Sequence, residues 1–117
     1  MRSALSPAAL VALWVGFFAS SVYGHAALKL AVGGRRGLVA AATSAWGISA
    51  FAAWTLSGVL WMAVLEAHPL LRASSISSLR YVFVCASAWM FLGERMGPRD
   101  AFGVALIALG VSLVARG

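Results

Sequence analysis

Hydrophobic residues fill nearly the whole chain, in four long runs that polar residues interrupt at only a few places. The runs cover about residues 8–32, 38–65, 70–92 and 99–115. At roughly 20 residues, each can cross a bilayer as an α-helix. None shows the alternating pattern of a barrel strand, and backbone groups in lipid must be hydrogen-bonded within their own segment. The pattern predicts an all-α membrane protein with four transmembrane helices in a single domain, 1–117.

The composition supports a membrane class and excludes several others. Hydrophobic residues make up 62% of the chain and charged residues 10%, and the mean hydropathy is +0.94. These values lie far outside the range of soluble globular domains. The net charge of +6 comes from basic residues placed singly or in pairs at segment ends. Because no basic run is present, we do not expect nucleic acid as a partner.

The sequence also lacks the residue patterns of an enzyme. It has no nucleophile beside a base, no pair of carboxylates and no cluster with metal-ligand spacing. Cys85 is the only cysteine and lies inside a hydrophobic run, so an intrachain disulfide is excluded. We therefore predict that the chain is not an enzyme, and we expect no cofactor and no metal.

Arginine and lysine residues are almost evenly divided between the two predicted membrane faces. One face carries Lys29, Arg35, Arg36, Arg95 and Arg99, and the other carries Arg2, Arg72 and Arg116. The difference leans weakly toward termini outside the cytoplasm. So small a bias is compatible with insertion in both orientations, or with a partner inserted in the opposite sense.

Arg80 is the most informative single residue, because it lies near the middle of the third hydrophobic run with no carboxylate at similar depth. A charge at the centre of a spanning helix costs roughly 2.5 to 3.5 kcal/mol and normally faces a wet cavity, a counter-ion or a bound anion. On a helical wheel, Ser77, Arg80 and Ser87 fall within about 80° of one another. A guanidinium in such a stripe suits a phosphate group. The alternative is a structural role, in which Arg80 snorkels, bonds carbonyls, or pairs with a carboxylate of another copy.

Several short motifs stand out along the chain. Gly24 and Lys29 are a glycine and a lysine five residues apart, the third predicted helix follows Pro69, and Leu92-Gly93-Glu94-Arg95 precedes the last helix. The last helix carries the most specific motif, from Gly103 to Val111. These motifs resemble those of the four-helix drug/metabolite transporter superfamily, an EamA-like fold of half-transporters. The superfamily includes the small multidrug resistance proteins and the subunits of the aminoarabinose-phosphoundecaprenol flippase.

The resemblance implies a small multidrug resistance-like unit in the bacterial plasma (inner) membrane. In the family the last helices of two protomers pack together, and Gly103 and Gly110, seven residues apart, would allow that close approach here. The expected assembly is an antiparallel dimer, either a homodimer or a heterodimer with a similar four-helix protein.

Departures from the drug-exporting branch favour the flippase-subunit branch. Drug exporters place a glutamate three residues before the conserved glycine, where this chain has Ser21, and Ser74 and Ser77 replace the aromatic residues of the drug site. The resemblance therefore implies a polyprenyl phosphate-linked phosphosugar, or another anionic amphiphile, as substrate. His25 either carries a proton or packs, and Lys29 either snorkels or holds a headgroup. A cation exporter and a non-transporting accessory subunit are the alternative functions.

Overall fold

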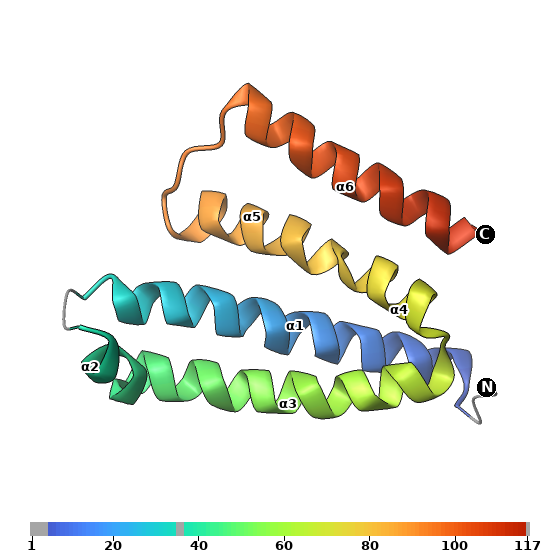
Figure 1. The fold of residues 1–117 in the computed structure, drawn as a ribbon, viewed down its shortest axis with the longest axis horizontal. Helices are drawn as coiled ribbons and strands as arrows, with labels where there is room; N and C mark the ends of the chain where they lie inside the picture. The colour runs from blue at the N-terminus through green and yellow to red at the C-terminus, as the bar shows by residue number, and fades with distance from the viewer. Residues whose placement is uncertain (1–4, 35–36, 117) are drawn as a thin grey trace. The chain divides into compact units, whose positions relative to one another are not determined.

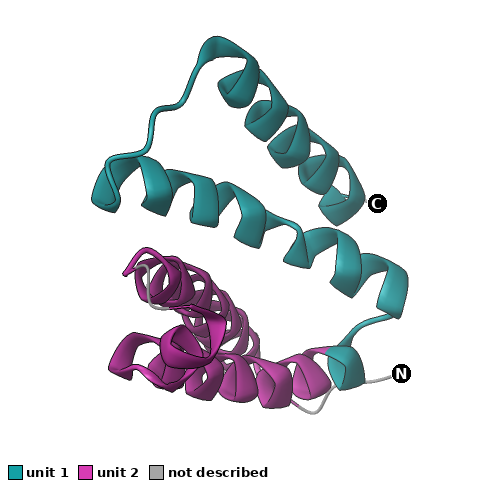
Figure 2. Ribbon diagram, turned by 60° about the vertical axis from the view of Figure 1, so that its left-hand side comes forward, with its two compact units in different colours: residues 1–3, 65–117 teal, residues 4–64 magenta. Residues whose placement is uncertain are grey.

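The computed structural model describes residues 5–34 and 37–116, and these residues form helices joined by short turns without any strand (Figure 1). The helices are α1 (Pro7–Val32), α2 (Leu38–Thr43), α3 (Ala45–Ala67), α4 (Leu70–Ser77), α5 (Leu79–Phe91) and α6 (Pro98–Arg116). The described residues divide into two compact units (Figure 2): the first in chain order ends at Val64 and is drawn in magenta, and the second begins at Leu65 and is drawn in teal. The mainly helical prediction is confirmed.

Three of these helices are long and apolar enough to cross a membrane. They are α1, α3 and α6. The sequence predicts four spans, and the two segments α4 and α5 replace the expected third span. Arg2, Arg35 and Arg36, which entered the prediction of orientation, lie outside the described residues.

In the first unit, α1 begins with a capped turn and packs along α3. The Ser6 hydroxyl accepts the Ala9 N–H at 3.1 Å, and Pro7 occupies the first helical position, an arrangement that satisfies free N–H groups at a helix start. Phe17 of α1 lies 5.3 Å from Trp61 of α3 between ring centroids. Two hydrogen bonds also join the helices, from the Tyr23 hydroxyl to Ser49 Oγ at 2.9 Å and from Trp54 Nε1 to the Ser21 carbonyl at 3.4 Å.

The expected helix over 38–65 is interrupted at Ser44, which has an extended backbone with ψ 166°. The Ser44 hydroxyl donates to the Ala41 carbonyl at 2.6 Å and accepts the Gly47 N–H at 3.1 Å. Ser44 therefore closes α2 and caps α3 at once. Gly47 is required there, because a Cβ at this position would overlap the carbonyl groups of Ala41 and Ala42.

The expected helix over 70–92 is likewise divided, at Ser78. The Ser78 N–H donates to Ser75 O at 3.2 Å, and the Tyr81 N–H donates to Ser78 O at 3.0 Å, so the turn is tighter than an α-helix. The hydroxyls of Ser77 and Ser78 both donate to Ser74 O. Serine hydroxyls that bond the preceding turn bend helices, and this run of serines accounts for the break.

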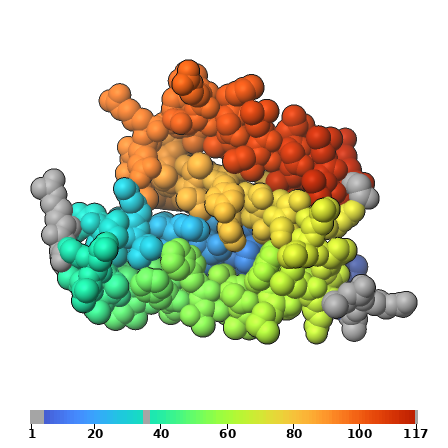
Figure 3. Space-filling view, in the orientation of Figure 1, coloured from blue at the N-terminus to red at the C-terminus, as the bar shows by residue number. Residues whose placement is uncertain are grey.

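The second unit is completed by a turn that brings α6 against α4 and α5. Gly93 has φ +70°, a value that favours glycine, and the N–H groups of Leu92 and Glu94 both donate to Ala88 O. The Asp100 carboxylate accepts the Gly97 N–H at 3.1 Å, which caps the start of α6. In the space-filling view α6, in orange to red, presents a continuous run of side chains at the surface (Figure 3).

Candidate functional site

Arg80 is the second residue of α5 and interacts with its neighbour Tyr81. Its Nη2 donates to the Tyr81 hydroxyl at 3.3 Å, and its guanidinium carbon lies 5.1 Å from the centre of the Tyr81 ring. Among the described residues, the buried Nε of Arg80 has no hydrogen-bond partner. A buried donor of this kind on a charged group is costly to leave unpaired. The arginine is therefore oriented by a phenol and retains an unsatisfied N–H.

A cavity of about 390 Å³ lies beside this pair, between α4, α5 and α6. Hydroxyl groups of Ser75, Ser78 and Tyr81 line one part of it. The remaining lining is apolar and comes from α6: Leu106, Ile107, Gly110, Val111 and Val114. Tyr81 thus connects Arg80 to a space that has a polar side and an apolar side.

The predicted partners of Arg80 on the same stripe are only partly brought together. Ser77 ends α4 and is 7% exposed, and its hydroxyl is already bonded to Ser74 O at 2.8 Å. Ser87 is half-buried on α5, about 10 Å beyond Arg80 along the helix axis. The stripe was predicted for one continuous helix, and the break at Ser78 separates Ser77 from the other two residues.

Ser21, His25 and Lys29 lie one turn apart on α1, in the first unit. Ser21 is 4% exposed, and its carbonyl accepts a hydrogen bond of 3.4 Å from Trp54 Nε1. The His25 ring meets the Trp54 indole edge to face, with centroids 5.2 Å apart. Lys29 is exposed in the last turn of the helix. Ser21 and His25 therefore share one partner, the Trp54 indole.

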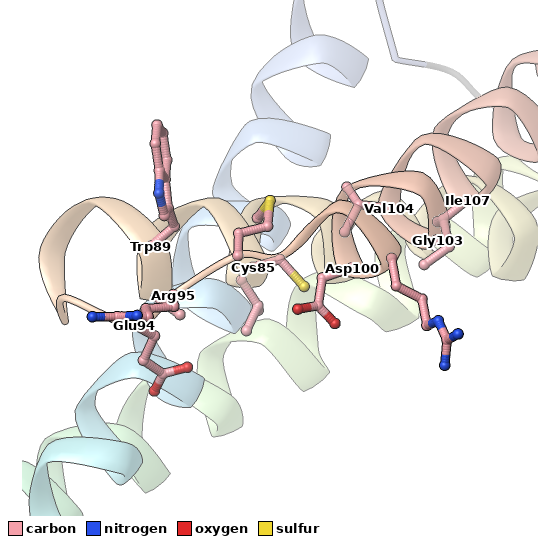
Figure 4. Close-up of a pocket in the computed structure, with 12 residues that line it drawn as sticks. Cys85, Trp89, Glu94, Arg95, Asp100, Gly103, Val104 and Ile107 are labelled. Carbon is pink, nitrogen blue, oxygen red and sulfur yellow. The ribbon is translucent and has the colours of Figure 1, made fainter.

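A larger cavity, of about 540 Å³, lies between α5 and α6 and was not predicted from the sequence (Figure 4). Its lining is charged at the turn between the helices and apolar along the helices themselves: Val84, Cys85, Ala88, Trp89, Glu94, Arg95, Met96, Arg99, Asp100, Gly103, Val104 and Ile107. The signal that could have revealed it is the cluster of four charged residues between the last two hydrophobic runs: Glu94, Arg95, Arg99 and Asp100.

Gly103 and Gly110, predicted to pack against a second protomer, both leave open space on α6. A Cβ built on either glycine would meet no other atom within 4 Å. Gly103 lines the larger cavity and Gly110 the smaller one. Close packing against the described residues of this chain therefore does not explain the two glycines. Among the described residues, no three His, Cys, Asp or Glu side chains could hold a metal ion.

One known protein family matches almost the entire chain. The model of the EamA-like transporter family matches residues 2–116. The chain belongs to the EamA-like transporter family. The resemblance seen in the sequence motifs is thereby confirmed. Together with the three apolar helices, it makes the chain a multi-pass inner-membrane protein.

Curated relatives match over a shorter segment. Proteins from Salmonella enteritidis and Salmonella gallinarum, each named probable 4-amino-4-deoxy-L-arabinose-phosphoundecaprenol flippase subunit ArnE, are 41% identical over 56 residues. A protein of the same name from Salmonella paratyphi B is 39% identical over 56 residues. The match covers 48% of this chain, and the chain spans about half, 50%, of the length of these relatives. No solved structure matches the chain significantly.

Proposed function

We propose that this EamA-like chain is one subunit of a dimeric transporter that moves a lipid-linked phosphosugar, or another anionic amphiphile, across the inner membrane. The observation that carries the proposal is Arg80, whose buried Nε has no hydrogen-bond partner among the described residues. A phosphate oxygen would satisfy that donor and neutralise the guanidinium in one contact. The names of the curated relatives, which are flippase subunits, support the same class of substrate. On this proposal the chain transports rather than catalyses.

The smaller cavity supports the same assignment. Tyr81 bonds Arg80 and lines this cavity together with the hydroxyls of Ser75 and Ser78. The Tyr81 hydroxyl accepts from Arg80 and keeps its own proton for a sugar or phosphate oxygen, and the serine hydroxyls, which donate to backbone carbonyls, can accept from sugar hydroxyls. The apolar side formed by α6 suits the start of a hydrocarbon chain. The hydrocarbon tail would remain in the bilayer. In this proposal Ser77, Ser87, Ser21, His25 and Lys29 are further contacts along the path of the headgroup.

We further propose that α4 and α5 together form the remaining span, which gives four spans in one domain. Residues 70–91 would extend about 33 Å at 1.5 Å per residue, enough to cross a hydrocarbon core of about 30 Å. The break at Ser78 is tolerated where the freed backbone groups find other partners, as the bonds from Tyr81 to Ser78 and from Ser78 to Ser75 do here. A four-helix protomer is too small to enclose a headgroup path alone, and an antiparallel pair supplies the second half.

A flipping assay tests the function with the protein as it exists in its membrane. The tagged chain is purified with any partner that co-purifies and reconstituted into vesicles containing a fluorescent polyprenyl phosphate, whose outer-leaflet fraction is quenched by dithionite. We expect wild-type protein to make the inner-leaflet lipid accessible to the quencher. Arg80→Gln should slow this at least about tenfold, because a charge-assisted phosphate contact contributes about 1.5–3 kcal/mol.

The matched control is Arg72→Gln, which removes an arginine on α4 near the predicted membrane surface. It should flip the lipid at the wild-type rate. Wild-type vesicles that move no lipid would support the accessory-subunit alternative instead. Flipping by Arg80→Gln at the wild-type rate would remove Arg80 from the mechanism.

A further inference from the structure

The cavity between α5 and α6 is polar at one end and apolar along the rest of its length. Its charged residues lie at the turn, and its apolar residues follow the two helices away from that turn (Figure 4). Between Asp100 and Ile107, α6 rises about 10 Å. Because α6 begins at Pro98 and is long and apolar enough to cross a membrane, we infer that the charged end lies at the membrane surface and that the apolar wall extends into the bilayer.

The charges at this end are available to a ligand. Arg95 and Arg99 are exposed and, within the described part of the chain, make no hydrogen bond or ion pair. The Asp100 carboxylate is engaged by the Gly97 N–H at 3.1 Å. The carboxylate of Glu94 is exposed, while its backbone N–H is fixed by Ala88 O at 3.1 Å. The cavity therefore offers two cations without an ion-pair partner and two carboxylates, Glu94 and Asp100, of which Asp100 also accepts a backbone N–H.

We propose that this cavity binds one membrane phospholipid that carries both a phosphate and an amine in its headgroup. Arg95 and Arg99 hold the phosphate, since guanidinium groups bind phosphate through paired hydrogen bonds. Glu94 accepts the amine. The first methylenes of an acyl chain lie against Ala88 on α5 and Val104 on α6. The site goes beyond the proposed function, because it uses none of the polar residues around Arg80 and requires no transport.

The volume of the cavity and its charges both favour a phospholipid whose headgroup has a phosphate and an amine. A cavity of about 540 Å³ has the size of small-molecule sites, which hold about 300–1,000 Å³. It accommodates a headgroup and the start of a chain, with the rest of the lipid in the bilayer. A purely anionic headgroup would leave Glu94 next to a like charge, and like charges repel. Phosphatidylethanolamine carries a phosphate that can pair with the two arginines and an amine that can pair with Glu94.

Native mass spectrometry of the full chain tests the proposal with defined lipids. The protein is offered an equimolar mixture of phosphatidylethanolamine, phosphatidylglycerol and undecaprenyl phosphate. We expect preferential retention of phosphatidylethanolamine by the wild type. Arg95→Gln and Arg99→Gln should each lower that retention several-fold. Glu94→Gln should abolish the preference for phosphatidylethanolamine over phosphatidylglycerol, and Arg116→Gln, at the other end of α6, should change nothing.

Two results would overturn the proposal in this experiment. One is equal retention of all lipids by the wild type. The other is preferential retention of undecaprenyl phosphate that Arg99→Gln removes, because the site would then belong to the transported lipid and not to a membrane phospholipid.

Substitutions that fill the cavity locate the bound lipid independently of charge. Gly103→Leu fills it from α6 and Ala88→Leu from α5, and both should reduce phosphatidylethanolamine retention. Gly110→Leu is the matched control, because Gly110 lines the smaller cavity and is not among the residues that line the larger one. Ala88→Leu also separates this role from dimerisation, since Ala88 lies outside α6. Unchanged retention by both filling variants would place the lipid elsewhere.

Cys85 provides a test that requires no substitution, because this residue, the single cysteine of the chain, lines the cavity. In vesicles of phosphatidylethanolamine, N-ethylmaleimide should modify Cys85 several-fold more slowly than in vesicles of phosphatidylglycerol. Labelling at the same rate in both vesicles would contradict occupation of the cavity by the amine-bearing lipid.

Discussion

At the residue scale, Gly24 determines how closely α1 approaches α3. A Cβ on Gly24 would overlap the Trp54 indole, whose Nε1 donates to the Ser21 carbonyl at 3.4 Å. Gly24→Ala should therefore lower the free energy of unfolding by about 1–3 kcal/mol, the usual cost of overpacking. Thermal unfolding in detergent, followed by tryptophan fluorescence, measures the change.

The control for this prediction is Gly16→Ala on the same helix. There the nearest atom to the new Cβ is the flexible end of Leu60, at 3.3 Å, so the loss should be clearly smaller. Equal losses at the two positions would show that the Trp54 contact does not limit the packing of α1.

Sequence reasoning identified Arg80 from its cost in a membrane, but it could not identify the partner of Arg80. Adjacent residues on a helix point about 100° apart and do not normally face each other, so Tyr81 gave no signal. The contact exists because both side chains are long. In the structure, Trp54 and Trp61 both contact α1.

At the element scale, the two helix breaks depend on serine hydroxyls and not on hydrophobicity. Around Ser44 the chain is mostly apolar, and the polar stretch around Ser78 contains no glycine or proline, so hydrophobic periodicity predicts one helix in each place. What divides these helices is the competition of serine side chains for backbone carbonyls. The turn before α6 was easier to predict, because Gly93 and Pro98 mark it in the sequence.

The tight turn at Ser44, between α2 and α3, leads to a prediction for Gly47. Gly47→Ala would push a methyl group into the carbonyls of Ala41 and Ala42, and backbone cannot move aside as a side chain can. We expect a loss of unfolding free energy of at least about 1 kcal/mol, measured by the same thermal unfolding. Gly58→Ala, on α3 in open space, should be neutral or stabilising by up to about 1 kcal/mol. An unchanged free energy of unfolding in Gly47→Ala would contradict the close contact of Gly47 with the carbonyls of Ala41 and Ala42.

At the scale of the whole molecule, the membrane class followed from composition because no soluble fold could bury so much apolar surface. The oligomeric assembly is harder to predict, because one sequence contains only one side of an interface. A stripe of exposed apolar residues runs along α6 beside the two glycines: Phe102, Leu106, Leu109 and Leu113. This stripe fits the proposed contact between the last helices of two protomers.

The proposed dimer leads to a testable prediction. Gly103→Leu and Gly110→Leu should each shift the purified protein from dimer to monomer, because the larger side chain separates the two backbones. Size-exclusion chromatography with light scattering measures the mass. Ser112→Leu, on the same helix, is the control and should remain dimeric. Dimers that persist in both glycine variants would move the interface away from this face of α6.

The central claim is that Arg80 recognises the phosphate of the transported lipid, and equilibrium binding of undecaprenyl phosphate tests it most directly. The wild type, Arg80→Lys, Arg80→Gln and the control Arg72→Gln are compared by titration in the same detergent. We predict wild-type affinity for Arg72→Gln, weaker binding for Arg80→Lys, and a loss of at least about tenfold for Arg80→Gln, as removal of a charge-assisted hydrogen bond requires. Equal affinity in all four proteins would contradict the account.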